Sequence, residues 1–232
     1  MEDNARSVEN FNGDGGKILF CILDGFWGIK VSKYLQDYFS IYMKQILPFK
    51  EYYTDFGRLF KSIDEKIKKL NAPNSGSTAT VVYIERNKEK RILFCANVGN
   101  SRYVLVNENG VMRLSYDDLI NDPKEYNRII KQRGIIVNNI INGRDMLSKS
   151  FGDWASKQNG IISAPHITKL EINNKDLFLI ITSDGMGDVI KDEECKIFSE
   201  KYTNTLDICK NLVQESINRG SKDNIICYVI KI

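Results

Sequence analysis

The sequence predicts an α+β domain in which strands pack into sheets and helices cover the outer faces. Three observations predict it. Two amphipathic helix patterns lie between residues 29 and 70, a block of β-branched and apolar runs fills 78–114, and two more helix patterns precede a last strand. The 232 residues contain no low-complexity tract, repeat or linker. We therefore interpret 1–232 as a single domain.

The first elements follow from hydrophobic spacing. KILFCIL (17–23) is a continuous apolar run, as in a buried strand. Apolar residues then recur every three or four positions over 29–47, which predicts a helix. A second helix is predicted from about Thr54 to Leu70, with Thr54 or Asp55 as its cap and Asn71-Ala72-Pro73 as its end.

The middle and end of the chain alternate between strand and helix patterns. Three runs predict strands, and Asn109-Gly110 within the third predicts a hairpin: TATVVYIE (78–85), RILFCANV (91–98) and RYVLVNENGVMRL (102–114). Asp122-Pro123 predicts the start of a short helix that ends before Gly134. The last predicted elements are a strand at LFLIITS (177–183), helices at 191–202 and 204–219, and a strand at IICYVIKI (225–232).

Composition narrows the functional classes. The net charge is only +3, and the one dense basic run, KEKR (88–91), lies where a solvated hairpin end is expected, so nucleic acid is not an expected partner. No apolar run is long enough to span a bilayer and no signal peptide is recognisable. Five cysteines without a CxxC pair favour a reducing compartment, cytoplasmic or nuclear, rather than secretion. No oligomerisation signal is present, so a monomer is expected.

Acidic residues recur at the ends of the most apolar runs. Asp24 follows KILFCIL, Asp184 follows LFLIITS, and Asp223 lies just before the last strand. One Asp-Gly pair is most often a turn. Three such placements predict that strand ends converge on one acidic pocket, which needs a cation such as Mg²⁺, Mn²⁺ or Ca²⁺. The single His166 excludes a site built from several histidines.

A series of short motifs extends this hypothesis along essentially the whole chain. In order they are Met1-Glu2-Asp3, ILDGFWG (22–28), Gly76-Ser77-Thr78-Ala79, ANVGNSR (96–102), NGRDMLSKSFGD (142–153), SDGMGDV (183–189) and GSKDN (220–224). Single pieces such as GSTA are weakly specific, but the full series resembles the metal-dependent, 2C-type protein phosphatase family. It looks like a divergent member that resembles the branch lacking the histidine of the DGHGG motif.

The resemblance implies a fold, an activity and a cofactor. The fold would be a four-layer α-β-β-α sandwich of two mostly antiparallel sheets flanked by helices. The activity would be that of a protein serine/threonine phosphatase, which hydrolyses phosphoserine and phosphothreonine in a phosphorylated protein substrate. Water activated between two divalent ions, Mg²⁺ or Mn²⁺, would attack the phosphate.

The resemblance also implies site residues. Asp24 would bridge both ions and, with Asp184 and Asp223, would form the catalytic centre. The implied direct metal ligands are Glu2, Asp24, the Gly25 carbonyl, Asp184 and Asp223. Contact with an ion through water is implied for Asp3 and Asp188.

Three departures from the family pattern bear on activity. Phe26 replaces the DGHGG histidine proposed as general acid, and a phenyl ring cannot donate a proton. Asn100 replaces an aspartate that holds a third, weaker ion, which puts that third metal position in doubt. Relatives also carry a phosphate-binding arginine on a strand upstream of Met1-Glu2-Asp3. The chain either lacks that edge strand or is cut from a longer protein with possible attached domains, and Glu2 is expected to fray.

Two functions therefore remain open from the sequence. The first is a metal-dependent phosphatase, with activity lowered by Phe26. The alternative is a pseudophosphatase, a regulatory binding module with weak or no turnover. Phe26, Asn100 and the unmatched arginine favour the alternative. The retained Asp24, Asp184 and Asp223 favour the enzyme.

Overall fold

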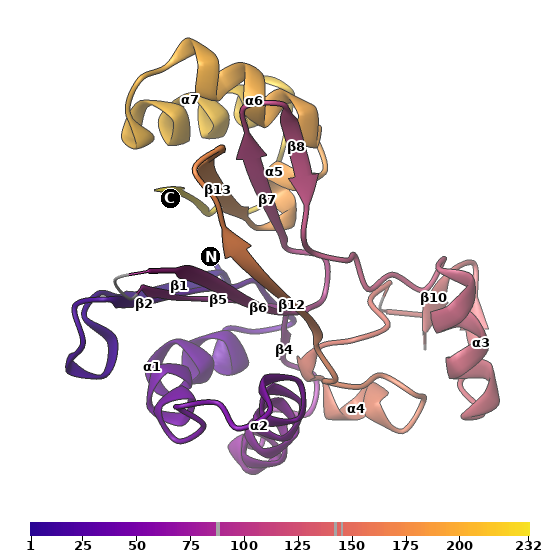
Figure 1. The fold of residues 1–232 in the computed structure, drawn as a ribbon. Helices are drawn as coiled ribbons and strands as arrows, with labels where there is room; N and C mark the ends of the chain where they lie inside the picture. Colours follow the sequence, from indigo (N-terminus) through magenta and orange to yellow (C-terminus); the bar gives the residue numbers. More distant parts are fainter. Residues whose placement is uncertain (87–88, 142, 145) are drawn as a thin grey trace.

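Two antiparallel sheets pack face to face, and helices cover both outer faces (Figure 1). The structure is a computed structural model and describes residues 1–86, 89–141, 143–144 and 146–232. The predicted four-layer sandwich is confirmed. None of the described helices is long and apolar enough to cross a membrane.

The two large sheets are antiparallel throughout. The first sheet contains, in spatial order, β1 (Asn4–Val8), β2 (Lys17–Leu23), β5 (Ala79–Arg86), β6 (Arg91–Val98) and β12 (His166–Ile172). The second contains β14 (Cys227–Lys231), β13 (Asp176–Thr182), β7 (Arg102–Asn107) and β8 (Gly110–Arg113). Short strands form a third sheet beside the first: β11 (Phe151–Gly152), β4 (Gly76–Ser77) and β3 (Gly25–Phe26).

Helices form the outer layers and a side lobe. Against the first sheet lie α1 (Lys30–Lys44) and α2 (Tyr52–Ile67), and against the second lie α6 (Asp192–Lys201) and α7 (Thr205–Asn218). The side lobe holds α3 (Pro123–Lys131) and the ribbon β9 (Ile136–Val137) with β10 (Ile140–Ile141) (Figure 1). Short helices complete the chain: η1 (Phe11–Gly13), η2 (Lys68–Leu70), α4 (Trp154–Lys157) and α5 (Asp184–Gly187).

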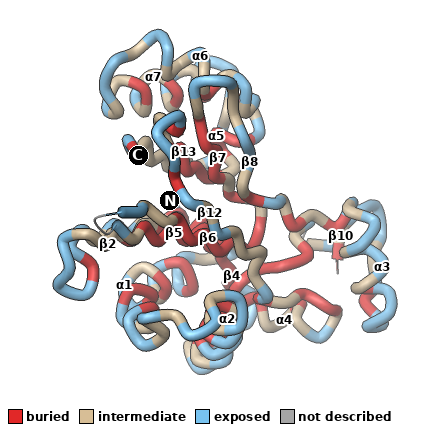
Figure 2. The backbone as a smooth tube through the Cα atoms, in the orientation of Figure 1, coloured by how far each residue is buried: buried red, intermediate tan, exposed pale blue. Residues whose placement is uncertain are grey.

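The sequences of the central strands are continuous apolar runs because both faces of these strands are buried. In β5, Val81 and Tyr83 face the cluster formed with α1 and α2, whereas Val82 and Ile84 face the cluster between the sheets. Successive side chains of a strand point to opposite faces, so both clusters draw on one strand. Figure 2 shows the resulting buried band through the first sheet and the exposed outer turns of the helices.

Several details differ from the sequence expectations. Helix α2 is capped by Glu51, whose carboxylate accepts hydrogen bonds from the Tyr53 and Thr54 amides, so the prediction of Thr54 or Asp55 as the cap is wrong. The β7–β8 hairpin pairs Asn107 with Gly110, so its two-residue turn is one position earlier than predicted. Strand β1 was not predicted at all. The basic run 88–91 lies partly outside the described residues.

Candidate active site

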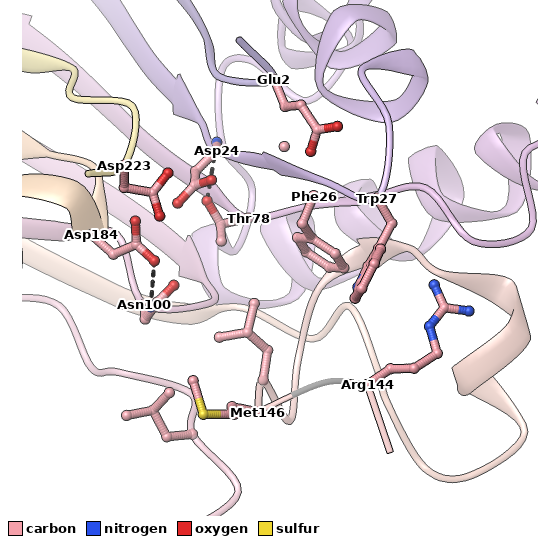
Figure 3. A pocket seen from close by; sticks show the side chains of 13 residues that line it. Glu2, Asp24, Phe26, Trp27, Thr78, Asn100, Arg144, Met146, Asp184 and Asp223 are labelled. Atoms are coloured by element: carbon pink, nitrogen blue, oxygen red, sulfur yellow. Dashed lines mark hydrogen bonds between the residues drawn. The ribbon is translucent and has the colours of Figure 1, made fainter. Parts of the chain in front are cut away.

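The predicted strand ends meet at one cavity of about 310 Å³. Figure 3 shows the Asp24, Asp184 and Asp223 side chains directed toward one another. Among its lining residues are four carboxylates and one amide, contributed by Glu2, Asp24, Asp184, Asp223 and Asn100. They come from the N-terminus, the end of β2, the start of α5, the segment before β14 and, for Asn100, the turn between β6 and β7. The structure thus brings together the acidic residues that the strand-end pattern selected.

Asp24 is held where β2 leaves the first sheet. Its amide donates to Thr78 Oγ1 at 3.2 Å, and its carbonyl accepts from the Thr78 amide at 2.8 Å. Burial raises the pKa of Asp24, and the neighbouring Asp184 and Asp3 carboxyls raise it further, because a second negative charge nearby disfavours ionisation. A cation would favour the ionised form.

Asp184 and Asp223 are positioned by a tight contact between two segments. A Cβ at Gly185 would lie 2.2 Å from the Asn224 carbonyl oxygen, so only glycine permits this approach after Asp184. The Asn224 amide donates to Asp223 Oδ1 at 2.7 Å, which orients that carboxylate. Asn100 Nδ2 donates to Asp184 Oδ2 at 2.9 Å (Figure 3).

Glu2 is anchored by several hydrogen bonds. Its amide donates to Asn224 Oδ1 at 2.9 Å, and its carbonyl accepts from Ser32 Oγ at 2.6 Å. The Gly28 amide donates to Glu2 Oε1 at 2.9 Å. The expectation that Glu2 frays is therefore wrong. Gly25 contributes to this anchoring, because a Cβ there would lie 2.4 Å from the Glu2 carbonyl oxygen.

Asp3 and Asp188 do not line the cavity. Asp3 is 7% exposed, and its Oδ2 is buried without a hydrogen-bond partner in the described part of the chain. Burial raises the pKa of Asp3 and of Asp188, and the Asp184 charge adds to both shifts. Asp188 lines a neighbouring cavity with Arg102 and Arg113.

Aromatic side chains form another wall of the cavity. Phe26 packs on Gly76 so closely that a Cβ at Gly76 would lie 2.3 Å from Phe26 Cζ. Trp27 adopts a left-handed backbone conformation (φ 55°), yet 56% of its surface is exposed. Phe26 therefore has a packing role at the position where the family has histidine, and Trp27 remains accessible at the rim.

The donor set fits hard divalent ions. Side-chain oxygen is offered to the cavity by Glu2, Asp24, Thr78, Asn100, Asp184 and Asp223. The buried oxygens Asp3 Oδ2 and Asn100 Oδ1 have no hydrogen-bond partner among the described residues. Within the described ranges, no three His, Cys, Asp or Glu side chains form a ready-made metal-binding group. Mg²⁺ commonly keeps several waters and takes only one or two carboxylates, so a closed protein cage is not required.

Sequence reasoning missed several cavity residues. Thr78 lies within the GSTA motif, and its hydroxyl accepts the hydrogen bond from Asp24. Arg144 and Met146 belong to the NGRDMLSKSFGD segment, of which positions 142 and 145 lie outside the described residues. Arg144 reaches the rim by packing on Trp27, which lies far from it in sequence. No local sequence pattern reports such a contact.

Comparisons with known proteins agree with this geometry. The profile of the family described as Protein phosphatase 2C matches residues 1–225. Protein phosphatase 2C homolog 1 of Schizosaccharomyces pombe is 31% identical over 240 residues, covering 100% of this chain and 69% of that protein. Probable protein phosphatase 2C 58 of Arabidopsis thaliana is 34% identical, covering 92% of this chain and 76% of that protein.

Solved structures share the fold. A serine-threonine phosphatase 2C from Toxoplasma gondii superposes with a TM-score of 0.82 at 18% identity, covering 99% of this chain and 90% of that chain. A C. elegans sex determining protein superposes with a TM-score of 0.83 at 17% identity, and this chain covers 61% of it. The sandwich and its acid-lined cavity define a phosphatase-type α+β domain. The chain belongs to the protein phosphatase 2C family.

Proposed function

We propose that the chain is a metal-dependent protein serine/threonine phosphatase that uses two divalent ions, Mg²⁺ or Mn²⁺. One observation carries the proposal: the carboxylates of Glu2, Asp24, Asp184 and Asp223 line one cavity, and the three aspartate side chains point toward one another (Figure 3). Like charges gathered this closely repel one another, and cations relieve the repulsion. A binding module has no evident need for such a costly arrangement.

Different residues of the chain would bind each of the two ions. Asp24, Asp184 and Asp223 would hold one ion, and Asp24 with Glu2 and the Gly25 carbonyl would hold the other. When bound, such ions supply a nucleophilic water at neutral pH and neutralise phosphate charge. The Thr78 hydrogen bonds fix Asp24, and the Asn224 amide fixes Asp223, so the carboxylates are oriented before substrate arrives. Asp3 and Asp188 are further proposed to reach the ions through water.

Departure of the serine or threonine oxygen is the step for which this cavity is least equipped. Phe26 cannot protonate the departing serine or threonine oxygen, so solvent has to supply that proton. Turnover of phosphopeptides is therefore expected to be slow compared with turnover of aryl phosphates, whose leaving groups need little protonation. The predicted loss is roughly a hundredfold, as for removal of a general acid.

Hydrolysis of p-nitrophenyl phosphate with and without Mn²⁺ tests the proposal. Asp184→Asn should lower Mn²⁺-dependent turnover at least about a hundredfold. The matched control is Asp37→Asn, on the exposed face of α1, where turnover should stay at the wild-type level. If the wild type shows no Mn²⁺-dependent turnover above Asp184→Asn, the pseudophosphatase alternative replaces this proposal. Calorimetric titration should give two Mn²⁺ per chain.

We further propose that this phosphatase works in the cytoplasm or nucleus. All five cysteines are free thiols, three of them buried. Unpaired cysteines throughout a fold are typical of reducing compartments. Imaging of a tagged chain tests this, and secretion into the medium would contradict it.

A further inference from the structure

The rim of the cavity carries one cation among its acids. Among the thirteen described residues that line it, Arg144 is the one basic side chain, beside four carboxylates. Its guanidinium lies 4.9 Å from the centre of the Trp27 ring, and its Nη1 donates to Asn74 Oδ1 at 2.8 Å. An arginine has five N–H donors, and the described residues give the Arg144 guanidinium a hydrogen bond to Asn74 alone.

Arg144 has no carboxylate within ion-pair distance among the residues that the structure describes. By contrast, several other arginines, including Arg102, Arg113, Arg128 and Arg219, are each bonded to an acidic side chain. An arginine fixed on an aromatic face and hydrogen-bonded at one end is preorganised for an anion from outside.

Trp27 gives this rim a second feature. A left-handed conformation is unfavourable for a bulky residue, and such strain persists where the surrounding structure enforces it, often at functional sites. Burial of the ring does not offset the strain, because Trp27 is 56% exposed. Met146, 63% exposed, lines the same cavity. The rim therefore offers aromatic and aliphatic surface next to a cation.

Figure 3 places the Trp27 ring between Phe26 and the Arg144 guanidinium, with the three aspartates on the other side of Phe26. A phosphate held at the aspartates would leave Arg144 facing a neighbouring part of the same substrate. We infer that Trp27 and Arg144 form a subsite for an acidic side chain that flanks the phosphorylated residue of a protein substrate. This inference rests on the proposed phosphatase function.

Peptide preference tests the subsite. Two phosphothreonine peptides are compared, identical except that the three residues on each side are Glu in one and Gln in the other. The wild type should prefer the Glu peptide roughly threefold to tenfold in kcat/KM at low salt. Arg144→Gln should bring this ratio to about one, and Arg144→Glu should invert it. Arg58→Gln, on the basic face of α2, should keep the wild-type ratio.

The ratio of kcat/KM for the Glu peptide to that for the Gln peptide is taken within each variant. A loss of rate that affects both peptides equally therefore cancels. A wild-type ratio of one, or a ratio unchanged in Arg144→Gln, overturns the subsite. Turnover of p-nitrophenyl phosphate, which has no flanking residue, separately reports the proposed phosphatase function. If that turnover is absent, fluorescence anisotropy of the two labelled peptides on the wild type gives the same ratio as affinities. Equal affinities then overturn the subsite as well.

Discussion

Asn100 donates a hydrogen bond from Nδ2 to Oδ2 of Asp184 at 2.9 Å, while its own Oδ1 is buried without a partner among the described residues. The Asn100 amide thus offers a hydrogen-bond donor to one Asp184 oxygen, which a cation would otherwise neutralise. An aspartate at this position could not donate that bond, and it would add a fifth carboxylate to the cavity.

Asn100→Asp should therefore make the protein more dependent on metal. In EDTA the free energy of unfolding should fall by about 1–2 kcal/mol, because two carboxylates then face each other. In Mn²⁺ the thermal midpoint should recover, and half-maximal turnover should need less Mn²⁺. Differential scanning fluorimetry and a Mn²⁺ titration of activity measure both effects. Asn218→Asp, at the exposed last residue of α7, is the control. An unchanged Mn²⁺ response of Asn100→Asp would make position 100 irrelevant.

Phe26→His should restore protonation of the leaving group. The expected gain is roughly tenfold or more in turnover of a phosphothreonine peptide, with little gain for p-nitrophenyl phosphate. Steady-state kinetics with both substrates separate a general acid from a change in binding. Phe26→Leu, which cannot donate a proton, is the control. Equal gains for both substrates would argue against a leaving-group effect.

Gly76→Ala should disturb the cavity wall through Phe26. The added Cβ would meet Phe26 Cζ at 2.3 Å, so the ring has to move, at a cost of about 1–3 kcal/mol in unfolding free energy. Gly57→Ala in α2 meets nothing within 4 Å and should be neutral or stabilising. Chemical denaturation measures both. In a Phe26→Ala background, Gly76→Ala should lower the free energy of unfolding by less than it does in the wild type. An equal loss in both backgrounds would mean that the added Cβ clashes with a residue other than Phe26.

The helix layer over the second sheet should show an acid-sensitive contact. Arg219 Nη2 donates to Glu194 Oε1 at 2.5 Å, and this bond holds the pKa of Glu194 below its ordinary value of 4.5. A lowered acid pKa contributes stability above pH 4.5, and that stability is lost as the pH falls through the folded-state value. Glu194→Gln should lower the thermal midpoint at pH 7, and this difference should shrink below pH 4.5 and vanish once the pH is below the folded-state pKa of Glu194. It should also be absent in an Arg219→Gln background.

Much of the fold could be predicted because hydrophobic spacing reports burial directly. Strands buried on both faces, such as β2 and β13, give unbroken apolar runs, and the aspartates that follow them mark the edge where the runs end. That is why Asp24 and Asp184 could be selected before their tertiary contacts were visible. The cap of α2 was misplaced because glutamate is an unusual N-cap, and the expected Thr54 and Asp55 lie inside the first turn.

The rest of the site depends on contacts that no local pattern contains. Strands β3 and β4 are two residues long and have no measurable period. The packing of Phe26 on Gly76, and of Arg144 on Trp27, joins segments that lie far apart in sequence. His166 illustrates the same limit. Its Nε2 lies 2.9 Å from Asp118 Oδ1, 48 residues earlier in the chain.

The hydrogen bond between the Glu2 amide and Asn224 has a consequence for the order of events in the cell. A chain still on the ribosome cannot make this contact, or bring Asp223 to the cavity, until translation has passed position 224. Earlier segments can collapse into the first sheet and its helices while synthesis continues. Phosphatase activity should then begin only after these last side chains have left the exit tunnel, so that a stalled or truncated product is inert.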